Sequence, residues 1–320
     1  MSQDHAHGVT NSRVSTKLVA ASAATLVLVL AELTMGWLAD SLALIGDALH
    51  NFTDALALVI ALVAIRLERR PPTEEKSFGY QRAGILAAFI NAGTLVALTV
   101  FIIVEAVDRF RSPRPVGSTE MIVIASIAFA LNAGITFALR REGRSDVNIR
   151  SAVIHMLGDA VSSLGIIAAA ILIRITGSAR WDPGVSVFIA ALILWSAWGI
   201  LKETVNLLLE GTPAGIDPAV VTKALAAIDG VHGVHHLHIW ALGPSHPALS
   251  CHLFVGDVPV RSTSLLLERV TAMLHREYRI EHTTVQFEFT ACSDGSVYCV
   301  PPMSSGDSSG PAANQRAGAH

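Results

Sequence analysis

Six apolar runs dominate the first two thirds of the chain, and each is interrupted by few charged residues. A helix needs about 20 residues to cross the hydrocarbon core of a bilayer, and each run reaches or approaches that length. The breaks between the runs carry clusters of Gly, Pro, Asp and Arg, which are typical of loops. The pattern predicts six membrane-spanning helices, over residues 17–38, 42–65, 83–107, 121–139, 151–175 and 183–201.

After Gly211 the pattern becomes that of a soluble domain with alternating short elements. Asp217 followed by Pro218 is typical of a helix N-terminus. Apolar residues then recur with helical spacing, next with the strand-like pattern of two segments, next with helical spacing again, and last with the alternation of a third strand. The order α-β-β-α-β predicts an α+β sandwich with its helices on one side of a three-stranded sheet, from residues 220–228, 234–240, 248–256, 262–275 and 283–289.

The two patterns divide the chain into four parts. The tail after Cys299 is rich in Pro, Gly, Ser and Ala and has little apolar surface to bury, so it is predicted to be disordered. The expected parts are an N-terminal tail over 1–16, a transport domain over 17–210, an α+β regulatory and dimerisation domain over 211–291, and a tail over 292–320.

Composition agrees with a membrane protein. The chain is 52% hydrophobic and only 15% charged, which is more apolar and less charged than a usual soluble domain. The net charge is −3, and the sequence shows no basic surface suited to nucleic acid, so nucleic acid is not an expected partner. The three cysteines are an odd number, which argues against a disulfide framework.

Lys and Arg are distributed unequally between the loops on the two sides of the predicted helices. One side holds the basic residues near both termini and in two of the loops, including Arg66, Arg69, Arg140 and Arg144. Because such residues accumulate on the cytoplasmic side, both termini are expected in the cytoplasm. The expected location is the inner (plasma) membrane, crossed several times.

A histidine followed four residues later by an aspartate occurs twice, each time inside an apolar run: His50 with Asp54, and His155 with Asp159. Residues four apart lie on one helix face, so each pair presents two metal-type ligands to the same point. Burying an ionisable side chain within the membrane costs free energy unless the side chain is paired or hydrated. The two pairs together predict a site for a divalent cation. The alternative is polar contacts that only hold the helices together.

The donor set favours zinc. Two imidazoles and two carboxylates form a tetrahedral nitrogen and oxygen set that suits Zn²⁺ and tolerates Cd²⁺ or Co²⁺. Asp47 and Asn51 share the stripe of His50 and are candidate pathway residues. Glu32 is a weaker candidate, which either lines the pathway or makes an interhelical hydrogen bond.

Departure of the metal would leave two carboxylates in a poorly solvated cavity, so protons are expected to replace it. The predicted function is therefore efflux of zinc from the cytoplasm in exchange for protons. Two other classes remain open, a membrane-embedded zinc metalloenzyme and a membrane-anchored metal sensor. The metalloenzyme is disfavoured because catalytic zinc usually keeps three protein ligands and an open position. An enzyme is therefore not expected.

The runs Ser41 to Asp54 and His155 to Ser163 resemble the second and fifth helices of cation diffusion facilitators, and the resemblance extends to His238-Ile239-Trp240. It implies a homodimer of six-helix subunits that exchanges metal for protons, with a metallochaperone-like cytoplasmic domain. The loop Arg140 to Arg144 holds no histidine, which is similar to bacterial zinc-efflux members of the family.

The resemblance also implies regulatory metal in the cytoplasmic domain, with zinc as both substrate and regulator. The matching positions are candidate ligands: His235, His238, His252, His282, Glu288, Cys292 and Cys299. Four further histidines of this domain are expected to be solvated: His232, His236, His246 and His275.

Overall fold

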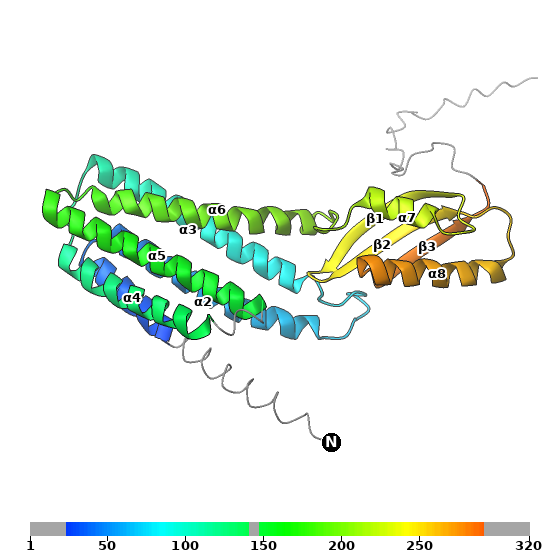
Figure 1. Ribbon diagram of the computed structural model, residues 1–320, viewed down its shortest axis with the longest axis horizontal. Helices are drawn as coiled ribbons and strands as arrows, with labels where there is room; N and C mark the ends of the chain where they lie inside the picture. Colours follow the sequence, from blue (N-terminus) through cyan, green and yellow to red (C-terminus); the bar gives the residue numbers. More distant parts are fainter. Residues whose placement is uncertain (1–23, 141–146, 291–320) are drawn as a thin grey trace, which may run out of the picture. The chain divides into compact units, whose positions relative to one another are not determined.

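The computed structural model describes residues 24–140 and 147–290, and the chain divides after Gly211 into two compact units. Within the described residues, the first unit holds five helices long and apolar enough to cross a membrane, and a shorter apolar helix, Ala24–Leu38, precedes them. Residues 17–23 of the first predicted span, and both predicted tails, lie outside the described residues. The five long helices are α2 (Leu42–Glu68), α3 (Ala83–Arg111), α4 (Ser118–Leu139), α5 (Val147–Thr176) and α6 (Trp181–Leu208) (Figure 1).

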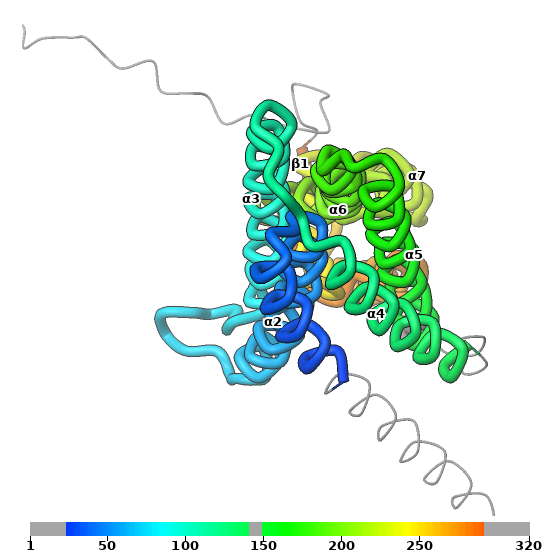
Figure 2. Tube along the Cα trace, turned by 90° about the vertical axis from the view of Figure 1, so that its left-hand side faces the viewer, coloured from blue at the N-terminus to red at the C-terminus, as the bar shows by residue number. Residues whose placement is uncertain are grey.

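The predicted helices are confirmed in order and type, but several are longer than expected. α6 continues to Leu208 and α3 to Arg111, because a helical backbone continues through charged residues that end an apolar run. Within the bundle α3 packs along α6 and α4 packs along α5, while α2 contacts α3, α5 and α6 (Figure 2). α2 therefore contacts both packed pairs, which also meet directly where α5 packs against α6.

A tight turn joins the helix Ala24–Leu38 to α2. Asp40 lies in the left-handed region at φ 50°, and the Ser41 hydroxyl accepts a hydrogen bond from the Leu44 amide at 3.2 Å. Ser41 thus acts as the predicted helix cap. Gly36 allows the two helices to approach closely, because a Cβ there would lie 3.0 Å from Leu44 Cβ.

A buried carboxylate holds the start of α2 against α6. Asp182 is fully buried and accepts hydrogen bonds from the Ser41 hydroxyl at 2.6 Å, the Leu42 amide at 2.8 Å and the Ala43 amide at 3.2 Å. The guanidinium of Arg109 lies 3.9 Å away, so the carboxylate is also close to a positive charge. Asp182 therefore satisfies amides that the first turn of α2 leaves without helical partners.

The second unit has the predicted order α-β-β-α-β. Its sheet order is β1-β2-β3, and β2 runs parallel to β3, which requires the crossover that α8 provides. This confirms the expected fold class for the domain. The elements are α7 (Pro218–Ala226), β1 (Gly233–Gly243), β2 (His246–Phe254), α8 (Val260–Tyr278) and β3 (His282–Glu288).

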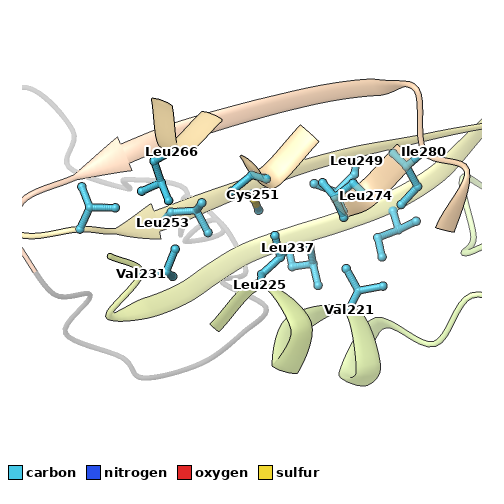
Figure 3. Close-up of a cluster of buried hydrophobic side chains, with 13 residues drawn as sticks. Val221, Leu225, Val231, Leu237, Leu249, Cys251, Leu253, Leu266, Leu274 and Ile280 are labelled. Carbon is cyan, nitrogen blue, oxygen red and sulfur yellow. The ribbon is translucent and has the colours of Figure 1, made fainter. Parts of the chain in front are cut away.

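One apolar core joins both helices of this unit to the sheet (Figure 3). Val221 and Leu225 of α7 and Leu274 of α8 meet alternate strand residues such as Leu237 and Leu253. Alternation along a strand sends every second side chain to the same face. The intervening strand residues are therefore left for the other face, where most of the histidines lie.

Candidate metal sites

The two histidine–aspartate pairs of α2 and α5 meet inside the helix bundle. His50 Nε2 lies 3.6 Å from Asp54 Oδ2 and 4.0 Å from Asp159 Oδ1. His155 Nε2 lies 3.2 Å from Asp54 Oδ2 and 3.6 Å from Asp159 Oδ2. The imidazole rings are 5.9 Å apart between centroids and nearly perpendicular. Each histidine therefore faces the carboxylate of the other helix as well as that of its own.

These separations suit a small ion with four ligands. An ion bound tetrahedrally at about 2.0 Å from each ligand holds the ligand atoms about 3.3 Å apart. The four nitrogen–oxygen distances run from 3.2 Å, which is close to that value, to 4.0 Å between His50 and Asp159. The ligand atoms of His50, Asp54 and His155 lie within 4.8 Å of one another, and the Asp159 carboxylate lies beside this group, with Oδ1 toward His50 and Oδ2 toward His155.

The polar atoms of the site lack hydrogen-bond partners among the described residues. Unpaired buried atoms include His50 Nδ1, Asp54 Oδ2 and Asp159 Oδ2. Asp159 is the most enclosed of the four, with 4% of its side chain exposed, whereas His155 is 40% exposed. Buried polar atoms without partners are costly, so an arrangement that leaves such atoms on three of the four ligands is typical of a binding site.

The two candidate pathway residues lie on the same helix as His50 but do not join the four ligands at these distances. Asp47 and Asn51 are both buried, at 1% and 3% exposure. Asp47 lies three residues nearer to the Ser41 end of α2 than His50 does, which is about 4.5 Å along the helix. Glu32, from the preceding helix, is also completely buried.

A second cluster of metal-type ligands lies in the α+β unit. Glu288 at the end of β3 places Oε2 at 2.8 Å from His235 Nε2, and Oε1 at 2.9 Å from His252 Nδ1. The ligand atoms of His235, His236 and His252 lie within 4.8 Å of one another. Three neighbouring strands thus bring three imidazoles and a carboxylate together.

His236 was expected to be solvated, but the structure places its ring against that of His252 with centroids 4.5 Å apart. Neighbouring residues of a regular strand point to opposite faces. Here His236 has a φ of 50°, in the left-handed region, which breaks the alternation, so His235 and His236 both place their rings beside that of His252. Residues other than glycine are uncommon in that conformation, although histidine adopts it more often than most, and the sequence carries no signal for it beyond the adjacent pair of histidines.

The other candidates of this set do not join the cluster. His238 is exposed on β1. His282 begins β3 and pairs in register with Ala248, whereas Glu288 pairs with Phe254 at the far end of the same strand. At about 3.3 Å per residue, His282 and Glu288 are about 20 Å apart along β3. Cys292 and Cys299 lie outside the described residues.

Burial and charge act on this second cluster in opposite directions. Burial lowers the pKa of His252 and outweighs the nearby Glu288 carboxylate, which favours the protonated ring. Burial raises the pKa of Glu288, but the hydrogen bond from Gln286 and the two histidines lower it further, so the net shift is downward. An imidazole without a proton and an ionised carboxylate are the forms that bind a metal ion.

The fold and the two ligand clusters define a multi-pass membrane protein with metal-type ligands both inside its helix bundle and in an α+β domain. The chain belongs to the cation efflux family. The model of the cation efflux transmembrane domain matches residues 18–209, and that of the cation efflux protein cytoplasmic domain matches residues 213–289.

Relatives of known name cover nearly the whole chain. The chain is 41% identical over 91% of its length to the zinc transporter ZitB of Pectobacterium atrosepticum, of which the match covers 90%. It is 35% identical to a cadmium, cobalt and zinc/H(+)-K(+) antiporter of Bacillus subtilis, covering 84% of this chain and 87% of that one.

The chain is also similar to a solved structure, the metal-bound C-terminal domain of the CzcD transporter from Cupriavidus metallidurans. The two are 37% identical in sequence over a match that covers 23% of this chain. The match covers 99% of that structure with a TM-score of 0.21. Because the chain belongs to a family of transporters, the expectation that it is not an enzyme is confirmed.

Proposed function

We propose that the protein exports Zn²⁺, and also Cd²⁺ and Co²⁺, from the cytoplasm in exchange for protons. The ion is held by His50, Asp54, His155 and Asp159. The observation that carries this proposal is the convergence of these four side chains from α2 and α5, with nitrogen–oxygen distances of 3.2 to 4.0 Å.

The names of the relatives support the choice of ion. Relatives about 40% identical over nearly the whole chain are named zinc transporters, and the Bacillus subtilis relative is named for cadmium, cobalt and zinc. Two imidazoles and two carboxylates suit these ions, whereas Mg²⁺ and Ca²⁺ prefer oxygen ligands alone. The ligand chemistry and the relatives therefore favour the same group of metals.

Charge balance supports proton exchange. A divalent ion neutralises the carboxylates of Asp54 and Asp159, and its departure leaves two negative groups in a site of low polarity. Protons taken up by the histidines or carboxylates restore the balance, because metal ligands release protons when they bind and regain them afterwards. The Bacillus subtilis relative, named an antiporter with protons, agrees with this coupling.

The Lys and Arg distribution supports an arrangement in which both termini and the α+β unit lie in the cytoplasm. In this arrangement residues 17–210 form the transport domain, residues 211–291 form the regulatory and dimerisation domain, and the tails 1–16 and 292–320 flank them. A homodimer in the plasma membrane is the functional unit.

Metal bound in the α+β unit regulates transport. The ligands in this proposal are His235, His236, His252 and Glu288, whose side chains already lie together. Cys292 and Cys299 follow β3 and remain candidate ligands. We leave His238 and His282 out of this ligand set, because His238 is exposed and His282 lies at the other end of β3 from Glu288.

Flux measurements in proteoliposomes test the proposal, with a zinc dye and a pH dye enclosed together. Zinc entering vesicles should drive protons outward, and both signals should disappear in Asp54→Asn and Asp159→Asn. Ser163→Ala is a matched control, because Ser163 is buried beside Asp159 but its hydroxyl donates only to the Asp159 carbonyl at 2.9 Å. Undiminished zinc flux in the aspartate variants, or zinc flux without proton movement, would contradict the proposal.

A further inference from the structure

Three buried polar side chains lie outside the four-ligand site and have no role in it. Glu32 is 0%, Asp47 is 1% and Asn51 is 3% exposed. Two of the three are carboxyls within helices that cross the membrane or lie beside those that do. A carboxyl group at this depth costs several kcal/mol unless a partner compensates it.

The helical hairpin at the start of the bundle brings these residues to one place. Gly36 lies against Leu44 and Ile45. The two helices run in opposite directions because the turn at Asp40 joins them, so a residue one turn before Gly36 faces α2 about one turn after Leu44. Glu32 therefore faces the segment of α2 that begins with Asp47.

The polar atoms of this cluster are unpaired. Both carboxyl oxygens of Glu32, both of Asp47 and the Nδ2 of Asn51 make no hydrogen bond in the part of the chain that the structure describes. The Glu32 carboxyl nevertheless lies beside the side chains of Asp47 and Asn51, and the Asp159 carboxylate acts electrostatically on both carboxyls. Among the described residues, no Lys or Arg forms an ion pair with Glu32 or Asp47. Two neighbouring buried carboxyls without a cationic side chain beside them are the arrangement that a bound cation stabilises.

We propose that Glu32, Asp47 and Asn51 form a second binding position for the transported divalent cation, with oxygen ligands only, next to the four-ligand site. This inference rests on the proposed transport function and adds a second ion-binding site to the transport pathway. Asp47 is about 4.5 Å nearer to the Ser41 end of α2 than His50. In the proposed orientation the second position lies on the outer side, where the ion arrives after leaving His50 and His155.

The ligand chemistry fits a position from which the ion leaves easily. Carboxylate and amide oxygens are hard ligands that suit Mn²⁺ or Mg²⁺ well, whereas imidazole raises the affinity for zinc. Zinc is therefore held less tightly between Glu32 and Asp47 than between the two histidines. Conduction through a chain of sites requires binding that is strong enough for entry and weak enough for release.

Binding of Mn²⁺ alone, followed by electron paramagnetic resonance on the full-length protein in lipid, tests the second position directly. The background variant is His50→Ala with His155→Ala, which removes the imidazoles of the first site. Adding Glu32→Gln or Asp47→Asn to this background should lower the affinity for Mn²⁺ at least about tenfold, because loss of even a residue that only orients a ligand lowers metal affinity by that much. Adding Glu120→Gln, a carboxyl in the first turn of α4, is the matched control and should change nothing.

Transport by the single variants completes the test. Glu32→Gln and Asp47→Asn should lower the maximal zinc flux at least about tenfold, with zinc affinity at the four-ligand site changed less than about threefold. Glu32→Asp, which keeps the carboxylate, should retain part of both signals and shows that loss is not misfolding. Wild-type flux together with unchanged Mn²⁺ binding would overturn the proposal. Loss of proton movement with unchanged Mn²⁺ binding would also overturn it, in favour of a proton-carrying pair. Zinc flux that survives His50→Ala would instead count against the proposed function, because that result does not involve Glu32.

Discussion

Asp182 is the residue whose loss should most disturb the placement of α2, the helix that carries His50 and Asp54. Its carboxylate accepts hydrogen bonds from one hydroxyl and two amides at the start of α2, and it lies 3.9 Å from Arg109. A hydrogen bond to a charged group contributes about 1.5–3 kcal/mol, and breaking a buried charged network by removing one member costs about 3–5 kcal/mol. Asp182→Ala should therefore destabilise the protein by about 3–5 kcal/mol.

Thermal unfolding of the detergent-solubilised protein, followed by tryptophan fluorescence, measures this effect. At roughly 2–4 °C per kcal/mol for a unit of this size, the midpoint should fall by about 6 °C or more. Asp182→Asn keeps one acceptor oxygen and should fall between Asp182→Ala and wild type. Ser186→Ala is the control, because its hydroxyl only donates to the Asp182 carbonyl at 2.7 Å and its loss should cost about 1 kcal/mol or less. A midpoint for Asp182→Ala equal to that of Ser186→Ala would show that the Asp182 carboxylate does not hold the start of α2.

The glycines of the bundle should respond with opposite signs. Gly36→Ala should lower the unfolding midpoint by the equivalent of about 1–3 kcal/mol of overpacking, whereas Gly134→Ala in α4, where a new Cβ meets nothing within 4 Å, should raise it slightly. A stabilising Gly36→Ala would show that the hairpin is not closely packed. Burial raises the pKa of the Cys251 thiol to about 12, so Cys251 should not react with iodoacetamide at pH 8 until the protein unfolds, once the other two cysteines are replaced by serine. Rapid labelling of the folded protein, followed by mass spectrometry, would contradict this. Glu288→Ala should lower the pKa of His252 further, as measured by NMR, because it removes the carboxylate that favours the protonated ring. It should also weaken metal binding by the α+β unit at least about tenfold, and an unchanged affinity would remove Glu288 from the ligands.

The membrane helices were predictable because a bilayer imposes a length and an apolar composition that local sequence reports directly. The ends of these helices were harder to predict, because backbone hydrogen bonding and not lipid contact determines where a helix ends. α6 therefore continues through Lys202 and Glu203 to Leu208. The caps at Ser41 and Asp217 were readable because a short side chain and its helix are neighbours in sequence.

The intramembrane ligands share this local character. Each pair lies four residues apart on one helix, so only the meeting of α2 with α5 had to come from the fold. The partnership of Asp182 with Ser41 joins residues 141 positions apart and has no local signal. The same limit applies to Glu32 and Asp47, which come together through the close approach at Gly36.

The cytoplasmic cluster was harder to predict because strand register decides which histidines meet. His282 and Glu288 were equally plausible ligands in sequence, but β3 places them at opposite ends of its length. His236 joins the cluster through a left-handed backbone conformation that alternation does not predict. Sequence reports which residue types are present in a sheet far better than which of them share a face.

The central claim is that one ion is held jointly by α2 and α5, and anomalous X-ray diffraction at the zinc edge from the zinc-loaded protein tests it most directly. We expect a peak in the helix bundle, about 2.0–2.1 Å from the Nε2 atoms of His50 and His155 and about 2.0–2.2 Å from a carboxylate oxygen of Asp54 and of Asp159. A transport-competent protein whose membrane-embedded zinc lies away from these four side chains would contradict it.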